Sequence, residues 1–550
     1  MRHRHALAAA IFLALTVLHT WPLATDPARM SRIHDDEWLN AWAVSWIAHQ
    51  LPRAPLDLFD ANMFHPAEQA MRYTEPLVVP ALIGAPFYWL GASPLLTHNL
   101  LVLAGLLLTA LAMHRLVVHW TGDFWSGILA GALLTFGTAM ATRIAHIQFL
   151  HFYAFPFAVL ALDRLLTGGR ARDAAWVGVW VTVAALTSGY LVVLVVVALG
   201  AAFVIRAGDW WGPRATGIAV RLGGVAAVTG AVLLLLMRPY LGAELRRASV
   251  TDAGSIGESL LGFLRTAADL HYGLWSERFW SGDAPSAMFP GVVAIVLAGA
   301  AFATRGRHAP HGVRRMLIGI GAVGAVLSLG MLTPVYGWLA TVLPPLLGLR
   351  SPSRFAMLTI FALAALAGIG WSAVRERLNP RWQTAAAAGL LALATVESLH
   401  APIPYRELTR GEWYPPIYGM LEAAPPGPIA ELPVPRSVFF HENARYLLAS
   451  TQHWRPILNG FGGFYPASYA EAVRRLATFP SDDAVDYLRS VGVQTVIVHG
   501  NRMRYFHFRR VLAEADRRSD VRLEARLDRD VIYRIAPHDG REMGTIRPGR

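Results

Sequence analysis

The sequence has 550 residues, of which 54% are hydrophobic and 16% are charged, and its mean hydropathy is +0.39. Soluble domains carry about 25% charged residues, so the composition excludes an ordinary soluble protein and indicates an integral membrane protein. The formal net charge of +12 does not indicate a nucleic-acid partner, because the arginines lie mainly in short loops between apolar segments, where they orient membrane helices. The absence of cysteine excludes disulfides, cysteine metal sites and thiol nucleophiles.

Apolar segments of about 20 residues, the length that crosses a bilayer, recur from Ala6 to Glu397. The basic N-terminal segment has no small-residue cleavage site before a soluble domain, so we expect a retained helix rather than a signal peptide. The run from Ala174 to Ile205 is too long for one span, and "LTSGYL" divides it into two. We predict eleven spans in total; the other eight are Asn99–Val118, Phe124–Ala141, Phe149–Leu166, Ile218–Met237, Met288–Ala303, Met316–Leu332, Phe355–Ala373 and Thr384–Val396.

The short loops predict the orientation of the chain. Arg-rich short loops stay in the cytoplasm, and a cytoplasmic N-terminus places all of them there: "HRHALA", "DRLLTGGRARD", "RAGDWWGPRATGIAVR", "TRGRHAPHGVRR" and "RERLNPRW". The loops 26–98 and 238–286, the turn "RIAHIQFLH", the segment "TPVYGWLATVLPPLLGLRSPSR" and the C-terminal region then lie outside. We therefore predict a multi-pass membrane protein in contact with membrane lipids. The wealth of alanine, arginine, glycine and proline indicates a GC-rich bacterial genome, and hence a bacterial cytoplasmic membrane.

Three consecutive carboxylates, Asp35, Asp36 and Glu37, lie in the first predicted outer loop. Acids at a water boundary are readily solvated, so taken alone they indicate a polar cap on a loop. The following "WLNAWAVSWIAHQL" has apolar residues at helical spacing, which is typical of an interfacial helix. The later "PLVVPALIGAPFYWL" is apolar but broken by prolines, which favours a re-entrant or interfacial segment over a span.

Further polar side chains belong to the same predicted outer face. A base that deprotonates a hydroxyl group needs a carboxylate of suitable pKa, and a departing phosphate needs cations. An arginine at this face could bind a substrate phosphate, and it could equally well extend to ordinary lipid headgroups. Two histidines five residues apart face neighbouring sides of a helix, which favours a polar contact over a metal site. The further polar side chains that we place on this predicted outer face are those of Glu75, His146, Gln148, His151, Arg350 and Arg354.

Several segments, in order along nearly the whole chain, resemble those of bacterial multi-pass glycosyltransferases of the GT-C fold, in a poorly characterised group with an acid-plus-Asn-Trp element after the first helix. Each segment is loose, and their order and topology carry more weight than any one of them. They are "DDEWLNAW", "LDLFDANMFHPAEQAMRYTEPL", "AHIQFLH", "LTSGY", "MFPG", "LRSPSRFAML", "ILNGFGGFYP" and "FPSDDAVDYLRSVGVQTVIVH".

The resemblance implies transfer of a sugar from a polyprenyl-phosphate-linked donor to an extracytoplasmic acceptor, with an acid of the first outer loop as the base. Asp36 matches that acid best, because it stands four residues before Asn40 and six before Trp42. Relatives often have glycine before the acid, where this chain has Asp35, so Asp35 and Glu37 remain candidates. We also expect Asn40, and Tyr190 of "LTSGY", to bind substrate, together with the polar residues of the outer face named above. We expect no metal, although the three acids could contribute to a divalent-ion site.

We therefore expect the chain to divide into a helical membrane body, residues 1–399, an outer α/β domain, residues 400–537, and a polar tail, residues 538–550, that we expect to be disordered. In the α/β domain "IAELPV" and "VQTVIVHG" predict strands, and "YAEAVRRLATF" and "DDAVDYLRSV" predict amphipathic helices. "NGFGGFYP" could stack on a glycan, but a glycine-rich turn with a packed aromatic is favoured. A transporter or lipid flippase is the main alternative function, and a GT-C-like scaffold without catalysis, serving envelope assembly, is another.

Overall fold

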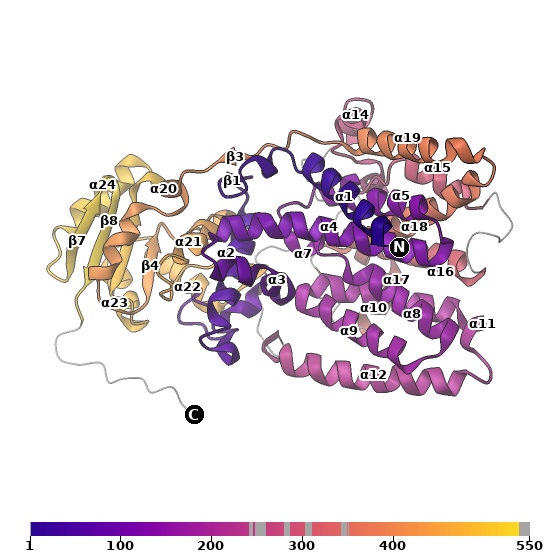
Figure 1. Cartoon of the computed structure of the whole chain (residues 1–550). Helices are drawn as coiled ribbons and strands as arrows, with labels where there is room; N and C mark the ends of the chain where they lie inside the picture. Colours follow the sequence, from indigo (N-terminus) through magenta and orange to yellow (C-terminus); the bar gives the residue numbers. More distant parts are fainter. Residues whose placement is uncertain are drawn as a thin grey trace.

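The computed structural model describes residues 2–240, 246–247, 260–279, 287–302, 311–342, 349 and 351–537. Figure 1 shows a body of helices that run alongside one another and a smaller part, at one end of the body, that is built around a β-sheet. The predicted tail and much of the predicted outer loop 238–286 lie outside the described residues.

Every predicted span coincides with helical structure. By length and composition, four of the described helices could cross a membrane: Pro94–Thr121, Ile147–Gly168, Ala215–Leu236 and Pro352–Arg375. The total of eleven therefore stays a prediction. The helices in the predicted spans are α1 (Arg2–His19), α4 (Pro94–Thr121), α5 (Phe124–Thr135), α8 (Ala154–Gly168), α9 (Ala171–Thr187), α10 (Gly189–Ile205), α12 (Ala215–Leu236), α15 (Val292–Ala300), α16 (His311–Ser328), α18 (Ala356–Arg375) and α19 (Pro380–Ser398).

The predicted span Phe124–Ala141 is not one continuous helix. Helix α5 ends at Thr135, the backbone is extended at Gly137, and two short helices follow, α6 (Thr138–Ala141) and α7 (Ile147–Leu150). Glycine is a poor helix former, and the hydroxyl of Thr142 donates to the carbonyl of Thr138 at 3.1 Å, a local bond that competes with helix continuation. The chain between α5 and α8 thus forms an irregular segment that carries His146.

Helix α18 lies at the centre of the body, where it packs against α5, α15 and α16. Its residues from Ala356 to Met357 and from Ala364 to Ala373 are buried. A Cβ atom at Gly370 would lie 1.8 Å from the carbonyl oxygen of Leu297 in α15, so only glycine permits this close approach. Further helices of the body are α11 (Ala207–Trp210), α14 (Asp269–Tyr272) and α17 (Pro334–Val342).

Helix α2 (Asp35–Gln50) carries the three acids and packs against α3 (Val78–Trp89), α4 and α21 (Ala444–Ser450). The sequence predicts an interfacial helix with one apolar face, but most of α2 is buried, including Trp42, whose indole N–H donates to Asn62 at 3.0 Å. The reason is that α21, from the C-terminal part of the chain, covers the side that would otherwise face lipid or water. Helix α3 has only 12 residues, as expected for a segment that does not span.

The C-terminal part contains a four-stranded sheet in the order β4-β6-β8-β7. The predicted strands correspond to β4 (Ile429–Leu432) and β6 (Thr495–His499), which are parallel and fully buried. The sequence did not predict β7 (Val521–Leu527) and β8 (Asp530–Ile535), which pair antiparallel and carry exposed charges. The helices are α20 (Arg410–Trp413), α21, α22 (Ala467–Leu476), α23 (Asp482–Ser490) and α24 (Tyr505–Ala515).

Two short strand pairs join distant parts of the chain. Strand β1 (Met30–Ser31) pairs with β3 (Arg406–Glu407), and β2 (Arg246–Arg247) pairs with β5 (Phe464–Tyr465). The glycine-rich turn before β5 packs closely on the first outer loop, since a Cβ at Gly462 would lie 2.3 Å from the carbonyl oxygen of Tyr73. This close packing agrees with the favoured interpretation of "NGFGGFYP" as a packed turn.

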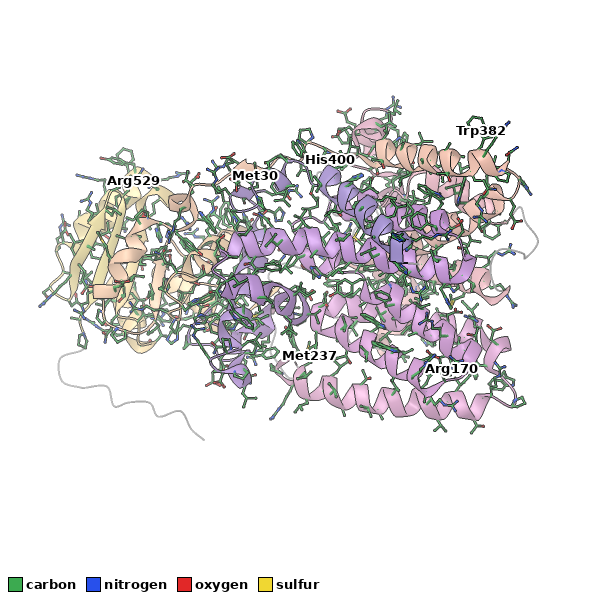
Figure 2. All side chains as sticks on the ribbon, viewed as in Figure 1. Met30, Arg170, Met237, Trp382, His400 and Arg529 are labelled. Carbon is green, nitrogen blue, oxygen red and sulfur yellow. The ribbon has the colours of Figure 1, made fainter. Side chains whose placement is uncertain are left out.

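Two loops that the sequence predicts to be cytoplasmic lie at the same end of the body. In Figure 2, Met30 lies between the helical body and the sheet-containing part, and His400 lies on the upper side of the helical body. Arg170 and Trp382, from two loops predicted to be cytoplasmic, lie toward the opposite end of the body, away from Arg529. The orientation relative to a membrane stays a prediction.

Candidate active site

Five segments that are far apart in the sequence bring polar side chains together at the N-terminal end of α2. They are the first turn of α2, the irregular segment before α7, the segment before α3, the start of α10, and the 3-10 turn Pro352–Phe355 before α18. The first turn of a helix also favours carboxylates, because the unpaired backbone N–H groups there carry partial positive charge. This cluster is the candidate active site.

Asp36 forms the centre of the cluster. Its Oδ2 atom lies 3.1 Å from Nε2 of His146 and 3.7 Å from Nδ1 of His34, and 33% of its side chain is exposed. Burial alone would raise the pKa of Asp36, but the hydrogen bond and charge of His146, with the charges of His34 and Arg354, outweigh it and lower the pKa to about 2. Asp36 is therefore an ionised carboxylate that solvent can reach.

Asp35 faces in another direction, toward the C-terminal part of the chain. Its Oδ2 atom lies 4.0 Å from Nε2 of His441. Burial raises the pKa of Asp35 to about 6, and the charge of nearby Asp36 adds to that rise, while His441 and Arg445 oppose it. Adjacent residues of a helix point about 100° apart, which is why the two carboxylates have different partners.

Glu37 is held in a closed environment. Oε1 accepts a hydrogen bond from the hydroxyl of Ser31 at 2.5 Å, Oε2 accepts one from the backbone N–H of Arg32 at 2.9 Å, and the residue is 1% exposed. Burial raises its pKa to about 7, although both hydrogen bonds act in the opposite direction. This carboxylate fixes the chain entering α2 and does not reach the cluster around Asp36.

Arg354 contributes the cation of the site. Its guanidinium carbon lies 3.9 Å from the ring centre of Tyr190 and 4.8 Å from that of Phe149. The hydroxyl of Tyr190 accepts a hydrogen bond from the backbone N–H of Ser351 at 3.3 Å. Within the described part of the chain, the Arg354 guanidinium forms no hydrogen bond or ion pair, so its N–H groups are open to a ligand. Stacking on two rings holds the planar group in place.

Glu75 lies close to the same cation. Its Oε2 atom accepts a hydrogen bond from the backbone N–H of Gly189, at the start of α10, at 2.8 Å. Burial raises the pKa of Glu75, and the charges of Arg354 and His146 reduce the rise. The carboxylate therefore links the first outer loop to α10, beside the ring of Tyr190.

The other predicted residues have supporting positions or lie elsewhere. The side-chain amide of Asn40 donates to the carbonyl of Ala145 at 2.9 Å and to Gln148 at 3.4 Å, so Asn40 and Gln148 fix the turn that carries His146. His151 is fully buried, with Nε2 3.0 Å from the carbonyl oxygen of Leu101 in α4, and does not join the cluster. Arg350 lies outside the described residues.

Sequence reasoning missed His34, which caps α2 and whose Nδ1 accepts the backbone N–H of Asp36 at 3.1 Å. The available signal was its position directly before the acids, the usual place of a cap residue. Among the residues that the structure describes, no group of three or more histidines and carboxylates could hold a metal ion. Independence from metal stays a prediction.

No protein-family model matches the chain, and no sequence among the curated proteins matches it. Among solved structures, the chain is similar to the arabinofuranosyltransferase AftD from Mycobacteria, with a TM-score of 0.62 and 16% identity over 98% of this chain and 40% of AftD. The chain adopts the GT-C fold. It spans less than half the length of AftD.

Two other structures show weaker similarity to this GT-C chain. The oligosaccharyltransferase AglB from Archaeoglobus fulgidus, in complex with an inhibitory peptide and a dolichol-phosphate, has a TM-score of 0.46 and 13% identity over 92% of this chain and 70% of AglB. ArnT from Cupriavidus metallidurans has a TM-score of 0.40 and 14% identity over 96% of this chain and 97% of ArnT. The fold assignment rests on AftD alone, and it confirms the GT-C fold implied by the sequence resemblance.

Proposed function

We propose that this chain is a membrane glycosyltransferase that moves a sugar from a polyprenyl-phosphate-linked donor to a hydroxyl group of an extracytoplasmic acceptor. The acceptor is a glycan, lipid or protein of the cell envelope. The observation that carries the proposal is the convergence of an ionised, solvent-accessible carboxylate, Asp36, with a guanidinium, Arg354, that forms no hydrogen bond or salt bridge in the described part of the chain, although the charges of Asp36 and Glu75 act on it. The proposed transfer needs a carboxylate that takes the proton of the acceptor hydroxyl and a cation that stabilises the departing phosphate.

In the proposed reaction, Asp36 takes the proton of the acceptor hydroxyl while that oxygen attacks the anomeric carbon of the sugar. The bond from this carbon to the phosphate oxygen breaks, and its electron pair stays on the phosphate. Arg354 then stabilises the added negative charge through its N–H groups. A single displacement of this kind inverts the configuration at the anomeric carbon.

The contacts of Asp36 indicate different roles for its two carboxylate oxygens. His34 and His146 both face Oδ2, and no hydrogen bond to Oδ1 is observed among the described residues. Oδ1 is therefore the atom that we assign to the acceptor proton. His146 holds the carboxylate in position, and it carries a buried Nδ1 without a partner in this part of the structure.

The acceptor approaches, in this proposal, from the side of the C-terminal part of the chain. Asp35 and His441 face each other across the boundary between α2 and that part, directly beside Asp36. The opposite side of the cluster, with Arg354 and Tyr190, belongs to the apolar helices of the body, where a polyprenyl chain would lie. Both substrates thus reach the site at the predicted outer face of the membrane.

The test is turnover by the purified chain in proteoliposomes that contain a panel of polyprenyl-phosphate-linked pentoses and hexoses. We expect release of free polyprenyl phosphate with at least one donor, and loss of that release in Asp36→Asn. Movement of an intact sugar lipid between leaflets, without release of polyprenyl phosphate from any donor, would contradict the proposal and favour the transporter or flippase.

A further inference from the structure

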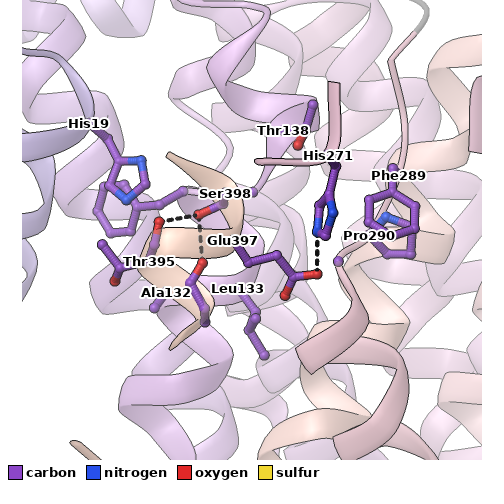
Figure 3. Close-up of a pocket in the computed structure, with 14 residues that line it drawn as sticks. His19, Ala132, Leu133, Thr138, His271, Phe289, Pro290, Thr395, Glu397 and Ser398 are labelled. Carbon is purple, nitrogen blue, oxygen red and sulfur yellow. Dashed lines mark hydrogen bonds and ion pairs between the residues drawn. The ribbon is translucent and has the colours of Figure 1, made fainter. Parts of the chain in front are cut away.

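The pocket between α5, α19 and the segment before α15 (Figure 3) has no room for a ligand. Its cavity measures about 20 Å³, which one or two water molecules would fill. Polar groups that line it bind one another: Nε2 of His271 lies 3.0 Å from Oε1 of Glu397, and that carboxylate also accepts the backbone N–H of Val293 at 3.0 Å. These bonds tie α14 and the start of α15 to the end of α19, which is a structural role.

Two arginines of the C-terminal part of the chain lie close together beside α2. Arg445 in α21 has its guanidinium carbon 4.8 Å from the ring centre of Trp38 in α2. Arg502, in the 3-10 turn that follows β6, has its guanidinium carbon 4.4 Å from the ring centre of Tyr446, the residue next to Arg445. Arg445 is exposed and Arg502 is partly exposed, so solvent reaches both. The two rings hold two planar cations in fixed positions.

Neither arginine forms a salt bridge with a carboxylate in the described part of the chain. Burial and the charge of Arg502 lower the pKa of Arg445, and the charges of Asp35 and Glu442 oppose that effect only in part. The two guanidiniums are therefore close enough to repel each other. No bonded anion among the described residues offsets this repulsion.

The carboxylate that acts on Arg502 has other partners. Glu431 in β4 is fully buried, and its Oε2 accepts hydrogen bonds from the hydroxyl of Tyr418 and from Nε2 of His499, which is 2.9 Å away. The hydroxyl of Tyr446 is a hydrogen-bond partner of Arg502 itself. Because a guanidinium has five N–H donors, Arg502 keeps N–H groups that can bind a ligand.

The arginine pair lies beside the acids of α2. Asp35 and Trp38 are three residues apart, so they share one side of the helix, and Arg445 both stacks on Trp38 and acts on Asp35 through its charge. Oδ2 of Asp35 is also 4.0 Å from Nε2 of His441. Asp36, the proposed base, is the next residue. An anion held by the arginines would thus lie within roughly 10 Å of the base, the width of a helix, on the side from which the acceptor approaches in our proposal.

The chemistry of the pair indicates the kind of ligand. Fixed guanidiniums recognise carboxylates and phosphates through paired N–H···O bonds, and an uncharged ligand would leave their mutual repulsion uncompensated. The donor phosphate has its own cation in Arg354, which stacks on rings of the helical body. We propose that Arg445 and Arg502 bind an acidic sugar of the acceptor, a uronic acid or a sugar phosphate, so that the acceptor is an acidic glycan. The inference rests on the proposed function, because it takes the ligand to be the acceptor.

The test measures how fast phenylglyoxal, which modifies arginine, reacts with each arginine of the full chain in nanodiscs, with the modified peptides quantified by mass spectrometry. The probes are glucuronate and glucose 6-phosphate at constant ionic strength, and methyl glucoside is the uncharged comparison. We expect at least one acidic probe at ~10 mM to slow the reactions of Arg445 and Arg502 roughly tenfold, as for a dissociation constant of about 1 mM. The probe that protects distinguishes a carboxylate site from a phosphate site.

The variants test whether the two arginines bind one ligand together. In Arg502→Gln the acidic probe should no longer protect Arg445, and in Arg445→Gln it should no longer protect Arg502, so either variant decides if the other does not fold. The matched control is Arg509→Gln, which removes an exposed arginine of α24 that has no salt bridge among the described residues. It should keep the full protection of Arg445.

Three results would overturn the inference. They are protection by neither acidic sugar, including the case in which polyprenyl phosphate protects instead and assigns the pair to the donor; equal protection by methyl glucoside or of Arg509 in the wild type; and protection of Arg445 that persists in Arg502→Gln. Protection requires no donor and no turnover, so Asp36→Asn should behave like the wild type. Failure here therefore leaves the proposed transferase with an uncharged acceptor, whereas failure of the transferase would leave the measured protection unchanged.

Discussion

Replacing Asp36 with asparagine removes a negative charge and almost nothing else. The asparagine side chain has nearly the same shape, and its oxygen can still accept a hydrogen bond from His146, which lies 3.1 Å from Oδ2 of the carboxylate. Asparagine cannot accept a proton from an acceptor hydroxyl. We therefore expect Asp36→Asn to fold and to bind donor normally while turnover is lost.

The surroundings of Asp36 set the size of the expected loss. General-base catalysis commonly contributes roughly a hundred- to ten-thousand-fold in rate. A carboxyl whose pKa is about 2 is fully ionised at neutral pH, but it is a weak base. We therefore expect a loss toward the lower end of this range, about a hundred- to a thousand-fold, or about 3 to 4 kcal/mol of activation free energy. The pKa also predicts that protonation of Asp36 will not limit turnover above about pH 4.

The assay measures release of free polyprenyl phosphate from the donor that the wild type accepts, together with donor affinity and the melting temperature of each variant. Asp35→Asn is the matched control, because it makes the same change one residue earlier, on a carboxylate that faces His441 instead of His146. We expect Asp35→Asn to retain most of the turnover. Asparagine mimics the protonated carboxyl, so the wild-type profile should fall near pH 6, where burial places the pKa of Asp35, by no more than the small loss expected in Asp35→Asn.

Full turnover in Asp36→Asn together with inactivity of Asp35→Asn would show that the base is the neighbouring carboxylate and that the approach of the acceptor is misassigned. Normal turnover in both variants and in Glu37→Gln would show that the acids are a solvated cap. In that case the proposed chemistry would lose its residue-level support.

Three further predictions follow from the fold and the site. Arg354→Gln should weaken donor binding about 10- to 100-fold in a direct binding assay, as for a lost charge-assisted hydrogen bond, and unchanged affinity would leave Arg354 as a headgroup anchor. The free energy of unfolding should fall by about 3 kcal/mol as pH rises from 4.5 to 7, because the pKa of Glu37 is about 7 in the folded chain and 4.5 ordinarily. A wild-type melting profile identical to that of Glu37→Gln over this range would refute this. In intact cells an impermeant thiol reagent should label Arg509→Cys and not Arg172→Cys, and the opposite pattern would reverse the predicted orientation.

The sequence predicted the helical class and the positions of the helices, because each depends on a local run of apolar residues. It did not predict where the helix after Phe124 ends, since a break at Gly137 costs little within an otherwise apolar run. It also missed strands β7 and β8: β7 carries alternating charges on its exposed face, and β8, although mostly apolar and buried, is only six residues long. Those strands depend on pairing with each other and with β6 rather than on their own composition.

The candidate site was predictable as a set of residue types but not as an arrangement. Three adjacent acids look alike in the sequence, yet Asp36 faces His146, Asp35 faces His441 and Glu37 is closed off beside Ser31. These partners differ because successive side chains on a helix point about 100° apart, and two of the three partners lie more than 100 residues away along the chain. Proximity of that kind is fixed by tertiary packing.

The pairing of β1 with β3 has a consequence for the biogenesis of the protein. Met30 pairs with Glu407, and Ser31 pairs with Arg406 while its hydroxyl binds Glu37 at the start of α2. The acids are made early in translation, but the strand that anchors them emerges from the ribosome only after every helix of the body. A nascent chain stalled before residue 400 would hold the apolar helices without this anchor and without the cover of α21. Incomplete chains would then hold the acids without the segments that complete the candidate site, which only the C-terminal part of the chain supplies.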